Sequence, residues 1–288
     1  MSAAPPALAH PRAFVPNWPV RLAWIVLALY LAYALSHLEL TPARFLAGLE
    51  FGRNFLAKLF PPDFARWELL LKGLKESLEM AVLASALGIA LSLPVSLLAA
   101  RNLMPGWVTW PARMLMVVCR SFHPVIVAIV FVKAVGFGAL AGILALTVAS
   151  VGFLGKLFTE AIEEISLKQV EAVRATGAPF MSVIAYGVLP QVFARFIGFA
   201  SYELDANLRN STMVGIVGAG GIGGTLFAAF QRFDYDFVCA ILIAIISLIM
   251  LGELFATAVR AIFIEGSTLR DLVRLRGAPH RDRLVEDD

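Results

Sequence analysis

The sequence carries little charge for its length. Only 16% of its 288 residues are Asp, Glu, Lys or Arg, whereas 59% are hydrophobic. Soluble domains carry ~25% charged residues, so this composition excludes a soluble globular protein and indicates an integral membrane protein. The net charge of +3 comes with no Lys/Arg stripe interleaved with aromatic residues. Nothing in the sequence therefore indicates a nucleic-acid partner.

Residue patterns for covalent, metal or nucleotide chemistry are also scarce. The two cysteines, Cys119 and Cys239, lie in apolar runs without motif spacing, which favours inert packing over a disulfide framework. The four histidines show no metal-ligand spacing, so no metal site and no catalytic residues are predicted. The phosphate-binding sequence G-x-x-x-x-G-K-S/T is absent. No cofactor is expected on this chain.

Long apolar runs are what the sequence has in abundance. A helix needs ~20 apolar residues to cross ~30 Å of hydrocarbon. Six runs predict an all-α, polytopic membrane protein with about six transmembrane helices. The third run is the weakest, because Arg120, His123 and Pro124 interrupt it. The predicted spans are 20–36, 77–100, 111–133, 135–158, 191–208 and 237–263.

The distribution of basic residues predicts an orientation. Six spans put both termini on one side, and the segments of that side hold more Lys and Arg than the opposite side. The positive-inside rule therefore predicts cytoplasmic termini. The predicted divisions are a cytoplasmic segment 1–19, a first span 20–36, an extracytoplasmic loop 37–76 with an amphipathic helix, a membrane-embedded core 77–263 with a cytoplasmic loop 159–190, and a cytoplasmic tail 264–288.

One polar stretch between the apolar runs has clear helix signals. Ser166 and Gln169 have the S-x-x-Q spacing of a capping box. Gly177 stands where a helix ends in a left-handed cap, and Pro179 blocks continuation. These signals predict a short helix of roughly ten residues.

The predicted short helix has two faces. Val170, Val173 and Gly177 share one face that can dock on the protein. Three charged side chains remain available to a polar partner. The alternative interpretation of the whole stretch is an ordinary cytosolic loop with a helical turn. The charged residues are Lys168, Glu171 and Arg174.

A glycine-rich segment imitates a nucleotide-binding motif. Residues 218–223 fit G-x-G-x-x-G, but no alternating strand and helix pattern surrounds them and no acidic residue follows at the ribose-binding distance. In a membrane such glycines permit irregular backbone and close helix approach. We expect a break or re-entrant turn before a short helix 225–231, with packing and gating both open as its role. The glycines are Gly218, Gly220, Gly221 and Gly223.

Ionisable and polar residues inside the fifth span form two groups. Asp205 and Arg209 are spaced i, i+4 and are expected to pair. Glu203, Asn207 and Asn210 form a separate polar stripe. Burying such groups is costly unless they face a partner or a cavity.

A second polar patch lies in the third span, where Arg120 and His123 precede the helix-breaking Pro124. Both patches have two interpretations: they lock helices together, or they contact a transported species. The candidate pathway residues are Arg120, Glu203, Asp205, Arg209, Asn210, Ser211 and Thr212, together with the four glycines.

The polar helix resembles the EAA signature of ABC importer permeases. Glu171-Ala172-Val173, then Gly177, then Leu189-Pro190 match the spacing of its pattern, EAA-x3-G-x9-I-x-LP. Val173 replaces the second alanine and Gly187 the isoleucine. Residues 74–263 resemble, more specifically, phosphonate importer permeases of the PhnE type. Segments 79–81, 93–94, 99–103, 120–124, 152–157, 160–163 and 209–223 carry this likeness.

The resemblance implies a type I ABC importer permease fold and a set of partners. These are a second copy of this chain, two cytoplasmic ABC ATPase subunits, an extracytoplasmic substrate-binding protein and the lipid of a bacterial inner membrane. ATP and Mg would then be bound by the ATPase subunits. The implied cargo is a phosphonate or a related phosphorus oxyanion. The implied ATPase-coupling residues are Glu171, Ala172, Val173, Arg174, Gly177, Leu189 and Pro190.

Rival functions remain open at this point. Within the importer class the solute could be methionine, phosphite or phosphate, since a glycine-rich segment like 217–223 also occurs in methionine-type permeases. A secondary transporter would show inverted repeats with paired broken helices, whereas the sequence has one broken region near Gly218. A membrane-embedded enzyme would need a nucleophile or metal constellation, which the sequence does not offer.

Overall fold

The computed structural model describes residues 18–37 and 41–261. Every regular element in these residues is a helix, as the sequence predicts. The chain divides into two compact units, Met1–Lys58 and Leu59–Asp288, and each is described by itself.

The first unit holds α1 (Trp18–His37) and nearly all of α2 (Pro42–Leu59). α1 is apolar on all sides and none of its residues is buried. It is also long enough to cross a membrane. A helix that is hydrophobic all round belongs in lipid or in a protein core, so α1 has the character of a first span.

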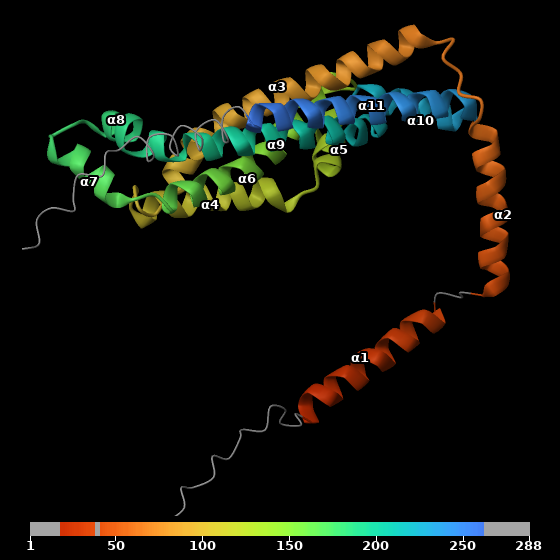
Figure 1. Cartoon of the computed structure of the whole chain (residues 1–288), viewed down its shortest axis with the longest axis horizontal. Helices are drawn as coiled ribbons and strands as arrows, with labels where there is room; N and C mark the ends of the chain where they lie inside the picture. The colour runs from red at the N-terminus through yellow and green to blue at the C-terminus, as the bar shows by residue number, and fades with distance from the viewer. Residues whose placement is uncertain (1–17, 38–40, 262–288) are drawn as a thin grey trace, which may run out of the picture. The chain divides into compact units, whose positions relative to one another are not determined.

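The second unit is a helical bundle built around α6, which is the most buried of the candidate spans. α6 packs against α3, α4, α5 and α9, and α11 packs against α9. Figure 1 shows α7 and α8 at one end of this bundle and α10 at the other. Its elements are α3 (Trp67–Ala99), α4 (Gly106–Ser121), α5 (Pro124–Val135), α6 (Ala139–Glu163), α7 (Leu167–Ala175), α8 (Phe180–Val183), the π-helical turn η1 (Ile184–Val188), α9 (Leu189–Ile216), α10 (Ile222–Gln231) and α11 (Tyr235–Arg260).

The predicted third span, 111–133, is broken at Pro124, as the sequence predicts. α4 and α5 meet there at an angle of 90°. Within the described residues, five helices are long and apolar enough to cross a membrane, or six if this bent pair counts as one. Pro124 lacks the N–H that a continuous helix needs. His123 has a clear local role, because its Nδ1 accepts a hydrogen bond from the backbone N–H of Val125 at 3.3 Å and so caps α5.

Other helix ends also differ from the prediction. α3 begins at Trp67, ten residues before the predicted start at Ser77. The fifth span is longer as well, because α8, η1 and α9 follow one another over Phe180–Ile216. α11 is described as far as Arg260, and the last predicted residues of that span lie outside the described chain.

Small residues let α6 approach its neighbours closely. A Cβ added at Gly152 would lie 2.8 Å from the backbone N of Arg120 in α4 and 3.0 Å from the carbonyl carbon of Cys119. At Gly155 it would lie 2.8 Å from Sδ of Met116. Such contacts are typical of membrane helices, where van der Waals packing replaces the hydrophobic driving force.

The end of the bundle that carries α10 is held by one arginine. Arg66 pairs with Asp234 at 2.6 Å and with Asp63 at 3.2 Å, and its guanidinium carbon lies 3.8 Å from the ring centre of Phe237. The hydrogen bond from Arg66 lowers the pKa of the Asp234 carboxyl below its usual value. This group therefore joins the start of α3 to the start of α11.

Gly152→Ala tests the close approach of α4 and α6. The added methyl group meets backbone atoms that have little freedom to move. We therefore expect the free energy of unfolding in detergent to fall by roughly 1–3 kcal/mol, measured by thermal or denaturant unfolding of the purified chain. Gly106→Ala is the matched control, because a Cβ there meets nothing within 4 Å. Equal stability of the two variants would contradict the packing argument.

Candidate coupling element and polar seam

The predicted polar helix is present as α7 and presents its charged side chains to solvent. Lys168, Glu171 and Arg174 are exposed, whereas Val170 is buried. Gly177 has φ +74°, the left-handed conformation predicted for the residue that ends the helix. The spacing of the sequence therefore identified both the helix and its exposed polar face.

The buried face of α7 rests on η1. Were a Cβ added at Gly187, it would lie 3.3 Å from Cα of Val170 and 3.7 Å from Cγ2 of Val173. An isoleucine at position 187 would push α7 away from η1 unless the backbone moved. Gly187, which departs from the EAA pattern, thus permits a close backbone contact between the two elements.

The predicted capping box is wrong. Within the described chain, the side chain of Ser166 makes no capping hydrogen bond to α7. The side chain of Gln191 in α9 takes the place expected for Gln169, because its Oε1 accepts from the backbone N–H of Ser166 at 3.0 Å. Its Nε2 donates to the carbonyl of Gly187 at 2.6 Å and to that of Ser166 at 3.4 Å. This contact joins residues 25 apart in sequence, which local spacing does not reveal.

Leu189 and Pro190 start the helix that carries Gln191. Pro190 lies in the first turn of α9, where its missing N–H costs nothing. Arg195, one turn further on, pairs with Glu164 at the end of α6. Gln191 and Arg195 therefore attach the start of α9 to both ends of the segment that leads into α7.

A buried polar seam joins three helices in the middle of the bundle. Oε1 of Glu203 in α9 accepts from the Ser150 hydroxyl of α6 at 2.5 Å. Nδ2 of Asn207 donates to the same hydroxyl at 3.0 Å and to the hydroxyl of Ser85 in α3 at 2.9 Å. All four residues are buried. This geometry supports a helix-locking role for Glu203 and Asn207.

The two serines of the seam were missed by sequence reasoning. Ser85 and Ser150 carry no charge and sit singly in apolar runs, so no spacing marked them. The available signal was that small hydroxyl residues in spans commonly hydrogen-bond across helices.

Asp205 and Arg209 form the predicted ion pair. Asp205 is buried and its Oδ1 has no hydrogen-bond partner among the described residues, whereas the Arg209 side chain is half exposed. Ser211, also buried, donates to the carbonyl of Leu208 at 2.8 Å, and Thr212 is partly buried. The pair is therefore anchored on its acidic side and open on its basic side.

One cavity of about 240 Å³ brings three of the pathway candidates together. Arg120 from α4 and Glu203 and Asn210 from α9 line it. Arg209, Ser211 and Thr212 are not among the described residues that line this cavity. The structure thus divides the predicted pathway residues into two groups.

The glycine-rich segment forms the break that the sequence predicts. Gly218, Gly220 and Gly221 all have positive φ, and α10 begins directly after them. The segment is tied to protein on two sides, since the N–H of Ile222 donates to the Ser77 hydroxyl at 2.9 Å and that of Gly138 to the carbonyl of Gly218 at 3.1 Å. These contacts favour the packing role, because irregular backbone at membrane depth must be satisfied by protein.

The fourth glycine, Gly223, lies inside α10 and is buried. A Cβ there would meet backbone atoms of α9, including Cα of Gly215 at 3.0 Å. Gly223 therefore permits α10 to fold back against α9.

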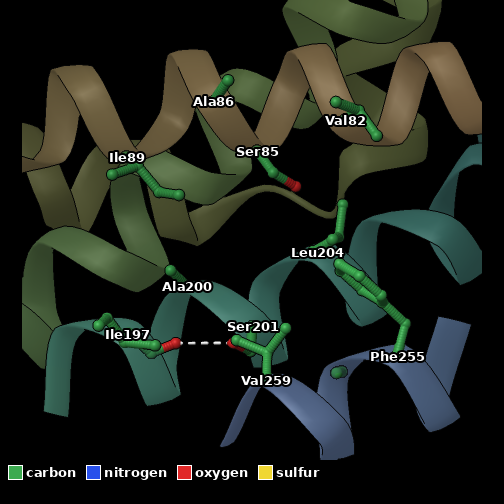
Figure 2. A pocket seen from close by; sticks show the side chains of 11 residues that line it. Val82, Ser85, Ala86, Ile89, Ile197, Ala200, Ser201, Leu204, Phe255 and Val259 are labelled. Carbon is green, nitrogen blue, oxygen red and sulfur yellow. Dashed lines mark hydrogen bonds between the residues drawn. The ribbon is translucent and has the colours of Figure 1, made fainter. Parts of the chain in front are cut away.

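A second cavity, of about 390 Å³, lies between α3, α9 and α11 and is almost wholly apolar. Figure 2 shows Val82, Ile89, Leu204 and Phe255 around it. The hydroxyl of Ser201 is already used by the carbonyl of Ile197 at 2.8 Å. This cavity offers no charged group to a polar solute and is not a candidate pathway.

Comparison with known proteins agrees with this architecture. Residues 92–265 match the family described as "Binding-protein-dependent transport system inner membrane component". The chain is 41% identical over 219 residues to the phosphite transport system permease protein PtxC of Stutzerimonas stutzeri, covering 76% of this chain and 80% of that protein. It is 40% identical over 194 residues to the phosphate-import permease protein PhnE of Mycolicibacterium smegmatis, covering 67% of this chain and 36% of that protein.

A solved structure has the same fold. The inward-facing MetNI methionine ABC transporter contains a chain that superposes with a TM-score of 0.61 at 25% identity. The match covers 69% of this chain and 99% of that one.

Gln191→Leu tests the attachment of α7. The substitution removes the hydrogen bonds to Ser166 and Gly187. A lost hydrogen bond of this kind costs roughly 1 kcal/mol, so backbone amides in α7 should exchange about fivefold faster. Hydrogen exchange read by mass spectrometry measures this directly. Lys168→Gln is the control, since Lys168 is an exposed residue of the same helix. Unchanged hydrogen exchange in Gln191→Leu would show that Gln191 does not attach α7.

Asn207→Ala tests the polar seam, and Asn210→Ala on the same helix is the matched control. Loss of the two hydrogen bonds to Ser85 and Ser150 should lower the free energy of unfolding by roughly 1–3 kcal/mol. Asn210→Ala should change stability little, because no side-chain hydrogen bond of Asn210 is present among the described residues. The midpoints of thermal unfolding of both variants decide the matter, and a larger loss for Asn210→Ala would refute the locking role.

Proposed function

The chain belongs to the family of binding-protein-dependent transport system inner membrane components, and from this premise we propose that it forms the pathway of an ATP-driven importer for a phosphorus oxyanion. The relatives at 40% and 41% identity are named for phosphate import and phosphite transport. Phosphonate belongs to the same chemical class. A tetrahedral oxyanion of phosphorus, namely phosphonate, phosphite or phosphate, is thus the proposed cargo.

The proposed assembly contains two copies of this chain, two cytoplasmic ABC ATPase subunits and one extracytoplasmic binding protein. The sequence lacks a phosphate-binding loop, so we assign ATP, Mg and hydrolysis to the ATPase subunits and no enzymatic step to this chain. Membrane lipid surrounds the outer helices. In this arrangement the chain converts ATPase closure and opening into alternating access.

The observation that carries the coupling role is the geometry of α7. Its charged residues face outward while Val170 and Gly187 press its other face onto η1. Gln191 fixes its start to α9, and α9 contains all the polar and charged pathway candidates except Arg120. A displacement of α7 by a docked ATPase would therefore be passed to α9 through hydrogen bonds and packed backbone.

The proposed orientation follows from the two ends of the bundle. α7 lies at one end and α10 at the other (Figure 1). Docking to a cytoplasmic ATPase puts the α7 end in the cytoplasm and the α10 end toward the binding protein. The excess of basic residues on the α7 side supports cytoplasmic termini in a bacterial inner membrane.

Methionine is the second candidate cargo, because the MetNI transporter shares the fold. Its likeness is 25% identity, against 41% for the phosphite permease relative. Arg120 at the cavity with Asn210 also supplies a positive group suited to an anion. Both observations favour the phosphorus oxyanion.

Glu171→Lys tests the coupling role in the reconstituted transporter with its ATPase and binding protein. Reversing a contact charge should lower phosphonate uptake and binding-protein-stimulated ATP hydrolysis together, by roughly tenfold. Glu171→Gln keeps the shape and removes the charge, so its loss should be intermediate. Radiolabelled uptake and phosphate release are the measurements.

Basal ATP hydrolysis and the yield of assembled complex are the controls. Wild-type stimulation in Glu171→Lys at equal assembly would exclude α7 from coupling. Competition separates the cargoes: excess phosphite or phosphate should inhibit uptake and methionine should not. Inhibition by methionine alone would overturn the proposed substrate class.

A further inference from the structure

Three basic side chains follow the facing surfaces of α4 and α6 at different depths. Arg113 lies beside Glu163 at the α7 end of α6, with Nη2 and Oε1 2.7 Å apart. Lys156 lies on α6 two turns before Glu163, and so further from the α7 end. The Arg120 backbone packs against Gly152. At 1.5 Å per residue, the seven residues of α4 from Arg113 to Arg120 place Arg120 roughly 10 Å deeper than Arg113.

These three cations line a single cavity of about 310 Å³. Its remaining lining comes from Met116, Val117 and Gly152, with no acidic residue among the described lining. The volume equals roughly ten water molecules at liquid density, so a small hydrated anion fits. Arg120 also lines the 240 Å³ cavity that contains Glu203 and Asn210, which makes the two cavities neighbours.

The three basic groups are not equally committed to the protein. Arg113 is anchored, because it also donates from Nε to the carbonyl of Ala99 at 3.0 Å. Lys156 forms an ion pair with Glu160, with Nζ and Oε1 3.4 Å apart, but both side chains are half exposed. Arg120 is exposed and has no ion pair within residues 18–37 and 41–261. Arg113 therefore acts as a brace, and the other two remain available to a ligand.

Arg120 lies at the end of α4, level with Gly152 near the middle of α6, and an exposed arginine at that depth is costly in lipid. Such residues face a water-filled cavity, a second protein chain or an anionic partner. The Arg120 face of α4 and α6 is consequently a poor lipid surface. Two adjoining cavities at this arginine fit an aqueous route.

We propose that Arg120 and Lys156 form a transient oxyanion site on the inner half of the pathway, an inference that rests on the importer function proposed above. The planar guanidinium of Arg120 binds two oxygens of a tetrahedral oxyanion, and the ammonium of Lys156 adds a point charge nearer the α7 end. Glu203, held by the Ser150 hydroxyl, lines the neighbouring cavity and not this one. Weak binding suits release to the cytoplasm.

Cys119 is a built-in reporter for this site. It lines the 240 Å³ cavity beside Arg120 and is partly exposed, whereas Cys239 is buried. In the assembled transporter, an anionic methanethiosulfonate should label Cys119 faster than a cationic one of similar size, because Arg120 attracts it. Mass spectrometry of the Cys119 peptide gives both rates. Their ratio cancels any change in the reactivity of the thiol itself.

Arg120→Gln should lower the anion-to-cation rate ratio on the order of tenfold, and Lys156→Gln by a smaller factor, since one unit charge is lost nearby in each case. Arg120→Lys should restore most of the ratio. Lys133→Gln is the matched control, because this exposed cation on α5 lines neither cavity. A ratio near one in the wild type, or a ratio unchanged by both Arg120→Gln and Lys156→Gln, overturns the site.

Protection by anions separates this inference from the choice of cargo. Phosphate and methylphosphonate at millimolar concentration should slow labelling of the wild type and leave Arg120→Gln unaffected. If sulfate protects and both phosphorus anions do not, the oxyanion site stands and the proposed cargo is wrong. If none of the three anions slows labelling, the site is refuted whatever the transporter carries.

Discussion

Polar groups inside hydrocarbon must find partners within the protein, because no water is there to bind them. The seam of Glu203, Asn207, Ser85 and Ser150 meets this constraint by joining α9, α6 and α3 at their centre. The glycine-rich break meets it by giving its backbone groups to Ser77 and Gly138. Both arrangements fix the position of α9, which connects the candidate coupling element α7 to the candidate pathway.

A membrane subunit of an importer needs stiffness between its partner surface and its pathway. In this chain a series of contacts can supply that stiffness. Val170 packs against Gly187, Gln191 is hydrogen-bonded to Ser166, and α9 continues from Gln191 as one helix. The apolar cavity between α3, α9 and α11 lies to one side of this connection (Figure 2) and adds space without charge. Three basic residues instead line the cavity at α4 and α6, so the apolar and the basic cavities lie on different helices.

Local spacing predicted the features that depend on neighbours in sequence. The helix of α7, its left-handed end at Gly177 and the ion pair of Asp205 with Arg209 all follow from separations of a few residues. Pro124 likewise marked the break in the third span, but composition contains no bend angle, so the 90° between α4 and α5 is known only from the structure. The capping box failed because a residue 25 positions away competes successfully for the same backbone group.

Sequence by itself determined that the chain is an all-helical membrane protein with a polar surface helix, since hydropathy and short-range spacing set both. Only the tertiary structure decided which polar residues meet. It placed Arg120 with Glu203 and Asn210, left Arg209 outside that cavity, and paired Asn207 with two serines that no motif marks. The reason is physical: a residue's position along its helix follows from its number, but the neighbour it faces depends on how separate helices rotate and pack against each other.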